Sequence, residues 1–336
     1  MRIFIDSVSG RLRAPWRLVA QFLFFVLVTA LLTGLLQVAY SLVNPAFPAF
    51  GSQGLSSEGF VTLFLLSGIS SLVAVFVSLL VVGRLLDRRP IADFGFHLSG
   101  GWFLDLGFGM FLGAFLMTGI FVVEFLLGWT SVSDTFVVVG SGGSFVLAIL
   151  APIVIFLCVG IYEEAFSRGY QLRNIAESLN YPALGPRTAT VLALILTSAF
   201  FGLLHASNPN ATAISTFNIA LAGLMLGAGY VLTGELSIPI GLHITWNFFQ
   251  GNVYGFPVSG LDTFGATFLD TQQAGPDTWT GGPFGPEAGL LGLLAMLTGT
   301  ILIALYTRVR TGKLDFHISL AEPPTKTSSI PKTPPE

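Results

Sequence analysis

The chain has 336 residues, of which 53% are hydrophobic and only 10% are charged. With a mean hydropathy of +0.78, this composition excludes an ordinary soluble domain and predicts an integral membrane protein. The formal net charge of -3 argues against a nucleic-acid partner, and the single cysteine, Cys158, excludes an internal disulfide framework.

The N-terminal segment "MRIFIDSVSGRLRAPWR" is basic and precedes an apolar stretch that is too long for the core of a cleavable signal. We therefore expect an uncleaved anchor in a multi-pass protein of the cell membrane. A membrane-spanning helix needs about 20 mostly apolar residues, and eight stretches of the chain meet this requirement. They cover residues 17–43, 60–83, 102–128, 145–165, 189–207, 213–232, 236–255 and 286–306.

The basic residues test this count, because Lys and Arg are retained on the cytoplasmic side of a membrane. All 15 fall before or at the first residue of the first stretch, or after the second, fourth and eighth stretches: Arg2, Arg11, Arg13 and Arg17; Arg84, Arg88 and Arg89; Arg168, Arg173 and Arg187; Arg308, Arg310, Lys313, Lys326 and Lys332. Seven spans would place the last group outside the cell. The pattern therefore predicts about eight transmembrane helices with both termini in the cytoplasm.

The expected fold is an all-α polytopic membrane protein embedded in the lipid bilayer. Its segments are a cytoplasmic N-terminus at 1–16, three helices with their loops at 17–143, a four-helix core at 144–256, a non-cytoplasmic loop at 257–285, a last helix at 286–306 and a cytoplasmic tail at 307–336. The loop is rich in Gly, Pro, Thr and Phe, which predicts an irregular cap. From residue 318 onward the tail has few apolar residues, so we expect disorder.

In the predicted span 213–232, Gly223 and Gly227 are four residues apart, which favours close packing of this helix against a neighbour.

The fourth stretch ends in "YEEAFSRG", where two glutamates and an arginine follow a long apolar run. Glu164 and Arg168 are four residues apart with the acid first, the favourable order for an ion pair on a helix. Glu163 is rotated by about 100° from Glu164 and can face a cavity. The alternative is a helix end that has simply reached the membrane surface.

Two of the four histidines, His205 and His243, lie inside predicted spans, where an ionisable side chain is by default a functional hypothesis. Asn247 follows His243 by four residues, so both face one side of a helix, and Phe201 precedes His205 by four. His97 and His317 lie in polar segments, where surface roles are expected.

These residue types suit hydrolysis by activated water. A glutamate and a histidine can take and return its proton, and His and Asn N–H groups can stabilise an oxyanion. No nucleophile stands out, because Ser167 and Ser198 have no base at a fixed spacing and Cys158 is surrounded by apolar residues. Glu163, His205 and His243 could also hold a divalent metal such as zinc, but the H-E-x-x-H pattern is absent, so metal dependence stays open.

The three motifs together resemble the CPBP family of intramembrane metalloproteases, which includes type II CAAX prenyl endopeptidases and Abi-type proteins. They read "EEAFSR" at 163–168, "FGLLH" at 201–205 and "HITWN" at 243–247, and "LDRRPIADFGF" at 86–96 is also similar to bacterial members. The resemblance implies that Glu163 and His205 activate the water and that His243 and Asn247 form the oxyanion site. Glu164, Arg168 and Phe201 are supporting residues, and the substrate is a membrane-associated peptide or protein.

Three competing functions stay open: a non-catalytic scaffold, a bacteriocin-immunity protein on the same fold, and a secondary transporter, whose mid-membrane charges look similar.

If all the helices were straight and centred in the membrane, Glu163 would lie near the inner membrane surface and His205 near the outer one. We therefore predict that the fifth helix begins early, around "GPRTAT", that "HASNPNAT" lines a wet cavity, and that the fourth helix continues through "QLRNIAESL".

Overall fold

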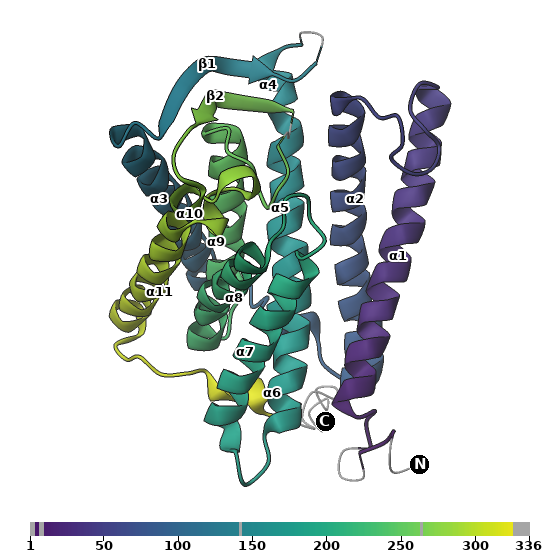
Figure 1. Ribbon diagram of the computed structural model, residues 1–336. Coiled ribbons are helices and arrows are strands. Elements are labelled where there is room, and N and C mark those ends of the chain that lie inside the picture. Colours follow the sequence, from purple (N-terminus) through teal and green to yellow (C-terminus); the bar gives the residue numbers. More distant parts are fainter. Residues whose placement is uncertain (1–3, 7–9, 141–142, 263–264, 325–336) are drawn as a thin grey trace.

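The computed structural model describes residues 4–6, 10–140, 143–262 and 265–324, and it is mainly helical (Figure 1). The α-helices are α1 (Ala14–Val43), α2 (Ser57–Ser78), α3 (Gly100–Leu126), α4 (Phe145–Ala148), α5 (Leu150–Glu164), α6 (Arg173–Leu179), α7 (Gly185–Leu204), α8 (Ala213–Thr233), α9 (Ser237–Phe248), α10 (Asp277–Thr280) and α11 (Leu290–Thr311). Three π-helical segments extend α2, α5 and α9: Leu79–Asp87, Ala165–Leu172 and Phe249–Val253.

Among the described residues, seven helical segments are long and apolar enough to cross a membrane. They are Ala14–Val43, Ser57–Asp87, Gly100–Leu126, Phe145–Leu179, Gly185–Leu204, Ala213–Thr233 and Leu290–Thr311. The protein is therefore a multi-pass membrane protein, as its composition predicted. The fourth segment continues past Glu164 to Leu179, which confirms the predicted extension of that helix.

The predicted span at 236–255 differs from the others, because α9 has only 12 residues before it continues as a π-helical turn. Residues Ser237–Trp246 are all buried, so α9 is an interior helix enclosed by its neighbours. Glycines on the neighbouring helices allow these helices to approach α9 closely. An added Cβ on Gly109 of α3 would lie 2.3 Å from the Ile238 carbonyl oxygen, and one on Gly160 of α5 would lie 2.5 Å from Ile244.

Helices α7 and α8 also pack closely, in agreement with the expectation for the pair of glycines in α8. An added Cβ on Gly223 would lie 3.0 Å from the Ser198 backbone, and one on Gly227 would lie 2.2 Å from Leu194. Helix α7 begins at Gly185, so its expected early start is confirmed and the predicted boundary at 189 was too late.

A two-stranded antiparallel sheet was not expected from the sequence. Strand β1 (Thr130–Val138) pairs with β2 (Ala266–Gln273), with Thr130 opposite Gln273. The predicted loop at 257–285 therefore contains a strand and the short helix α10. Glu124, at the end of α3, ties this sheet to the bundle, because its Oε2 accepts hydrogen bonds from Thr130 at 2.8 Å and Gln273 at 2.9 Å.

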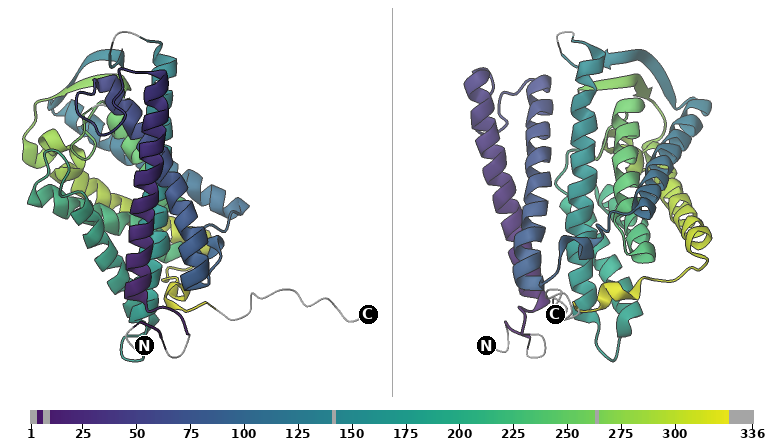
Figure 2. Two further views of the ribbon diagram at one scale, coloured as in Figure 1. Left: turned by 90° about the vertical axis from the view of Figure 1, so that its right-hand side faces the viewer. Right: turned by 180° about the vertical axis from the view of Figure 1, so that it is seen from behind.

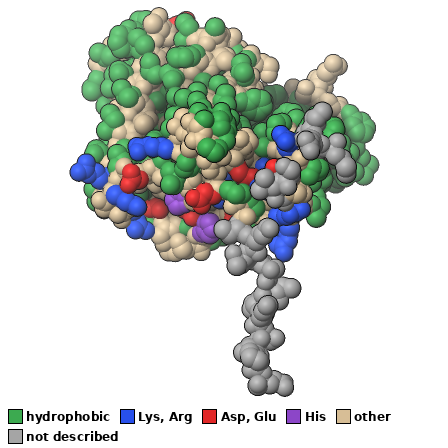
Figure 3. Space-filling model, turned by 90° about the horizontal axis from the view of Figure 1, so that it is seen from below, with side chains coloured by type: hydrophobic (Ala, Val, Ile, Leu, Met, Phe, Trp, Pro, Cys, Tyr) green, Lys and Arg blue, Asp and Glu red, His purple; other side chains and the backbone are tan. Residues whose placement is uncertain are grey.

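Helix α1 begins and α11 ends toward the same end of the bundle (Figures 1 and 2). We call this end, which carries Arg11, Arg17, Arg89, Arg173 and Arg310, the basic end. Viewed from there, Lys, Arg, Asp, Glu and His side chains gather on the face between hydrophobic ones (Figure 3). The arrangement agrees with the charge pattern of the sequence, and its orientation across the membrane stays a prediction.

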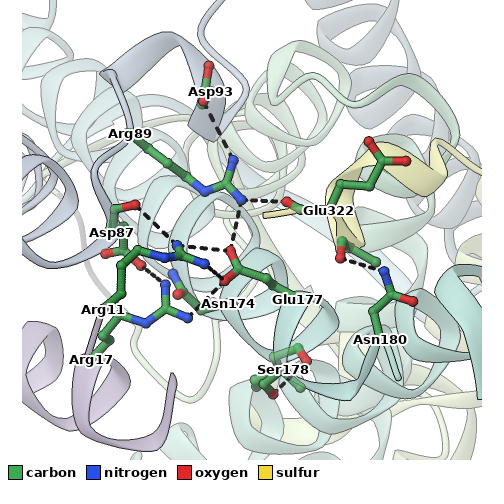
Figure 4. A network of polar contacts seen from close by, with 12 residues as sticks. Arg11, Arg17, Asp87, Arg89, Asp93, Asn174, Glu177, Ser178, Asn180 and Glu322 are labelled. Carbon is green, nitrogen blue, oxygen red and sulfur yellow. Dashed lines mark hydrogen bonds and ion pairs between the residues drawn. The ribbon is translucent and has the colours of Figure 1, made fainter. Parts of the chain in front are cut away.

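A buried ionic network joins segments far apart in the chain at the basic end (Figure 4). Glu177 pairs with Arg11, with Arg17 at 3.1 Å and with Arg89 at 2.8 Å. Asp87 pairs with Arg17 at 2.5 Å. The network therefore connects the N-terminal segment and α1 to α6 and to the segment that follows α2.

The start of the C-terminal tail packs against the bundle, which corrects the expectation of disorder from residue 318 onward. Ile318–Ala321 forms a 3-10 turn, and Leu320 and Ala321 are fully buried. Arg89 donates a hydrogen bond to the Glu322 carbonyl, and Asn180 donates one to the Ala321 carbonyl at 2.9 Å. Two apolar side chains and backbone hydrogen bonds suffice to hold this segment. Residues 325–336, which were also expected to be disordered, lie outside the described residues.

Candidate active site

The motif "EEAFSR" lies where α5 passes into its π-helical extension. Glu164 and Arg168 form the predicted ion pair, with Nη1 2.8 Å from Oε1, and both side chains are buried. Arg168 also donates from Nη2 to the Gly223 carbonyl at 3.1 Å, and its guanidinium lies 4.5 Å from the centre of the Phe201 ring. Arg168 therefore holds α5, α7 and α8 together. It is no loop residue, although the sequence grouped it with a cytoplasmic loop.

Glu164 contacts a second site residue, which the sequence did not predict. Its Oε1 lies 2.9 Å from Nδ1 of His243 on α9. Because a carboxylate oxygen only accepts, this geometry places a proton on Nδ1 and leaves Nε2 facing away from Glu164. Nε2 lies 3.9 Å from Oε2 of Glu163. That Glu163 oxygen is buried and has no hydrogen-bond partner among the described residues. The two glutamates thus flank one imidazole.

His205 caps the C-terminal end of α7, where its Nδ1 lies 2.8 Å from the Phe201 carbonyl oxygen. Nδ1 must donate in this bond, so Nε2 of the neutral ring is an acceptor. The ring packs against Phe201 with a centroid distance of 4.8 Å, and Phe201 in turn lies 6.2 Å from the His243 ring. The motif phenylalanine therefore contacts both histidines as well as Arg168.

One cavity of about 470 Å³ brings the four predicted catalytic residues together: Glu163, His205, His243 and Asn247 all line it. Most of the remaining wall is apolar and comes from α1, α2, α5, α7, α8 and α9. Val26 of α1 and Leu204 of α7 line the cavity and are exposed, so it reaches the surface of the bundle between these two helices. Both helices are candidate spans, so this opening faces sideways.

The turn "HASNPNAT" lies only partly within the protein. His205 and Asn208 line the cavity, whereas Ala206, Ser207 and Asn210 are exposed. The prediction that this segment lines a cavity is therefore correct for two of its side chains and wrong for the exposed ones. A tight turn sends alternate side chains in different directions, so one segment cannot bury all of them.

The side chains suggested as metal ligands, Glu163, His205 and His243, do not form a metal site as they stand. Within the described ranges, no three His, Cys, Asp or Glu side chains are grouped closely enough to hold an ion. Ser167 lines the cavity but makes no hydrogen bond to a base in the described structure, and Ser198 Oγ is buried without a partner. Cys158 is buried outside the cavity lining.

The sequence did not single out Glu287, whose side chain also lines the cavity. It lies in the 3-10 turn Pro286–Ala288 just before α11 and is 3% exposed. Burial raises the pKa of its carboxyl to about 7, although hydrogen bonds from Ser259 and Gln250 act in the opposite direction. The sequence offered one signal for this residue, because Glu287 is an acidic residue at the edge of the predicted span 286–306. In the structure this helix begins later, at Leu290.

The fold and the site define a class of protein: a multi-pass membrane protein whose inner helices enclose a cavity lined by glutamate, histidine and asparagine. Residues 145–249 match the model of the family described as type II CAAX prenyl endopeptidase Rce1-like. This match confirms the resemblance to the CPBP family and supports a CAAX-type intramembrane protease. It includes all three motifs and runs from α4 to the end of α9. Neither the curated proteins nor the solved structures give a match to the chain.

Proposed function

We propose that this protein is an intramembrane endopeptidase that uses a water molecule, rather than a nucleophilic side chain, to hydrolyse a peptide bond. The observation that carries the proposal is the cavity that Glu163, His205, His243 and Asn247 line together, although they come from three helices. The family of residues 145–249 supports a protease but does not decide the reaction at this site.

In the proposed reaction, water in the cavity attacks the carbonyl carbon of the substrate and Oε2 of Glu163 accepts its proton. This oxygen suits the role because it is buried and lacks a hydrogen-bond partner. Nε2 of His205 accepts a hydrogen bond from the same water and orients it. Glu163 then returns the proton to the amine nitrogen as the C–N bond breaks.

His243 and Asn247 line the same wall and form the proposed oxyanion site. The Asn247 amide makes no hydrogen bond among the described residues, so its N–H groups are available to a ligand. His243 donates from Nε2 when both ring nitrogens carry protons, while Glu164 holds Nδ1 in place. Such donors stabilise charge on the carbonyl oxygen as it develops.

The substrate in this proposal is a membrane-associated peptide or protein that enters sideways between α1 and α7. Phe22, Phe25 and Val26 of α1 and Leu204 of α7 line the cavity, and Val26 and Leu204 are exposed. An apolar segment of the substrate can therefore stay in lipid-like surroundings while its scissile bond reaches the polar wall.

The test compares membrane peptides from cells that carry the wild-type protein with those from cells that carry Glu163→Gln. We expect a cleavage product that is lost or reduced by about 10²–10⁴-fold in the variant, as for removal of a general base. Glu124→Gln is the matched control, because Glu124 is a fully buried glutamate that does not line the cavity. Identical peptides in all three samples would leave a non-catalytic scaffold as the better interpretation.

A further inference from the structure

Glu287 lies in a chain of hydrogen bonds that runs from the start of α11 to the turn that carries His205. Its Oε1 accepts from the Ser259 backbone N–H at 2.6 Å and from the Ser259 hydroxyl at 3.2 Å, and its Oε2 accepts from Gln250. The Ser259 carbonyl accepts from Asn208 Nδ2 at 3.0 Å, and the Asn208 backbone N–H donates to the His205 carbonyl at 3.1 Å. Each link is therefore a direct contact.

Ser259 occupies an unusual backbone conformation, which indicates that its position is imposed by these contacts. Its φ of 49° lies in the left-handed region that non-glycine residues rarely adopt. The neighbouring Gly260 has a φ of 85°, and an added Cβ there would lie only 1.8 Å from the Pro209 carbonyl oxygen. The loop at 258–260 is thus pressed against the turn at 205–210, and the hydrogen bonds that Ser259 donates to Glu287 hold it there.

Three members of this chain, Asn208, Ser259 and Glu287, line the same cavity as His205. Glu124 resembles Glu287 in its surroundings, because it is buried and its carboxylate accepts hydrogen bonds from one hydroxyl and one glutamine amide. Unlike Glu287, it does not line the cavity. A purely structural buried glutamate and a buried glutamate connected to the site can therefore be compared in one molecule.

We propose that Glu287 is a positioning residue for the site: it fixes Ser259, and through Ser259 and Asn208 it sets the place of the His205 ring in the cavity. The segment after α9, which lies outside the matched family region, is then part of the working site. This inference rests on the proposed peptidase function for its kinetic consequence, but the placement of the turn can be measured without it.

The kinetic test uses the purified full-length protein in lipid nanodiscs with a quenched fluorogenic peptide library, and then the peptide that the wild type cleaves fastest. We expect Glu287→Ala to lower kcat at least tenfold with KM changed less than twofold, and Glu287→Gln to recover part of the loss because it keeps one acceptor oxygen. Asn208→Ala breaks the same chain at its other side. The double variant Asn208→Ala with Glu287→Gln should be no slower than Asn208→Ala alone. Glu124→Gln should keep kcat.

A second measurement separates this inference from the proposed function. Amide hydrogen exchange of residues 203–211 should become at least tenfold faster in Glu287→Ala and Asn208→Ala, but not in Glu124→Gln. If the wild type cleaves no peptide of the library, the kinetic result counts against the peptidase proposal. The hydrogen-exchange rates of residues 203–211 then decide by themselves whether Glu287 positions the turn. Wild-type exchange in Asn208→Ala, or additive kcat losses in the double variant, would overturn the positioning role even if Glu287→Ala failed to fold.

Discussion

At the residue scale, Arg168 shows how a charge is kept inside a membrane protein. Its guanidinium is fully buried but has an ion-pair partner in Glu164, a carbonyl acceptor on α8 and an aromatic face on α7. A buried charge is tolerated when it is paired and hydrogen-bonded in this way. The spacing of Glu164 and Arg168 predicted the ion pair, whereas the contacts with α7 and α8 depend on residues more than 30 positions away.

Arg168→Ala should therefore destabilise the protein strongly, by about 3–5 kcal/mol, because it leaves the buried Glu164 carboxylate without its arginine partner. The measurement is the thermal unfolding midpoint in detergent. Arg187→Ala is the matched control, since Arg187 also stacks on a phenylalanine, Phe316, but is exposed. An equal loss of stability in the two variants would contradict this account of Arg168.

The Glu287 carboxyl predicts a pH dependence of stability. Its pKa in the folded protein is raised from 4.5 to about 7, so the folded state favours the neutral carboxyl. This contribution is fully present below about pH 4.5 and is lost as the pH rises through about 7, by about 3 kcal/mol in total. Relative to Glu287→Gln, the wild type should thus lose stability between pH 5 and pH 8 in a thermal melt. Parallel curves for the two proteins would show that the carboxyl is already ionised at pH 5.

At the scale of elements, glycines decide which helices touch. Gly223 and Gly227 of α8 let α7 approach, and Gly109 and Gly160 let α3 and α5 approach α9. The sequence revealed the spacing of the first pair but not its partner. The partner matters for the site, because α7 carries His205 and α9 carries His243 and Asn247.

Gly227→Ala should lower stability by about 1–3 kcal/mol, because the new Cβ would lie 2.2 Å from a Leu194 methyl group. Leu194→Ala in the same chain removes that methyl group and should restore part of the loss. The comparison is made on thermal midpoints of both single variants and the double variant. Strict additivity of the two losses would mean that Gly227 does not mediate this contact.

The paired strands show why the sheet escaped prediction. The segment "TSVSDTFVV" alternates β-branched and polar residues, which is typical of a strand, but its partner begins more than 120 residues later. A lone strand in a loop has no stability of its own, so only the position of Ala266–Gln273 above the same end of the bundle allows it to form.

At the scale of the whole molecule, the basic end and the opposite end differ in charge and in construction. The basic end is held by the ionic network around Glu177 and by the first residues of the tail (Figure 4). The opposite end is covered by the sheet and by α10. The distribution of Lys and Arg predicts that the basic end faces the cytoplasm.

This orientation can be tested by cysteine labelling in a Cys158→Ala background. Asp277→Cys, in α10, should react with a membrane-impermeant maleimide added to intact cells, because it lies at the end opposite the basic one. Lys313→Cys, just after α11, should react only after the membrane is opened. Labelling of Lys313→Cys from outside would reverse the predicted topology.

The sequence by itself determined the membrane class, the long helices, the uneven distribution of basic residues and the three motifs. These features depend on composition and on spacings of a few residues, so they can be read locally. Only the tertiary structure decided that Glu164 holds His243, that α9 is an interior helix, that the tail begins packed, and that Glu287 joins the site. Each of these depends on contacts between distant segments, and the free energy of burying or pairing such groups is set by neighbours that no local pattern specifies.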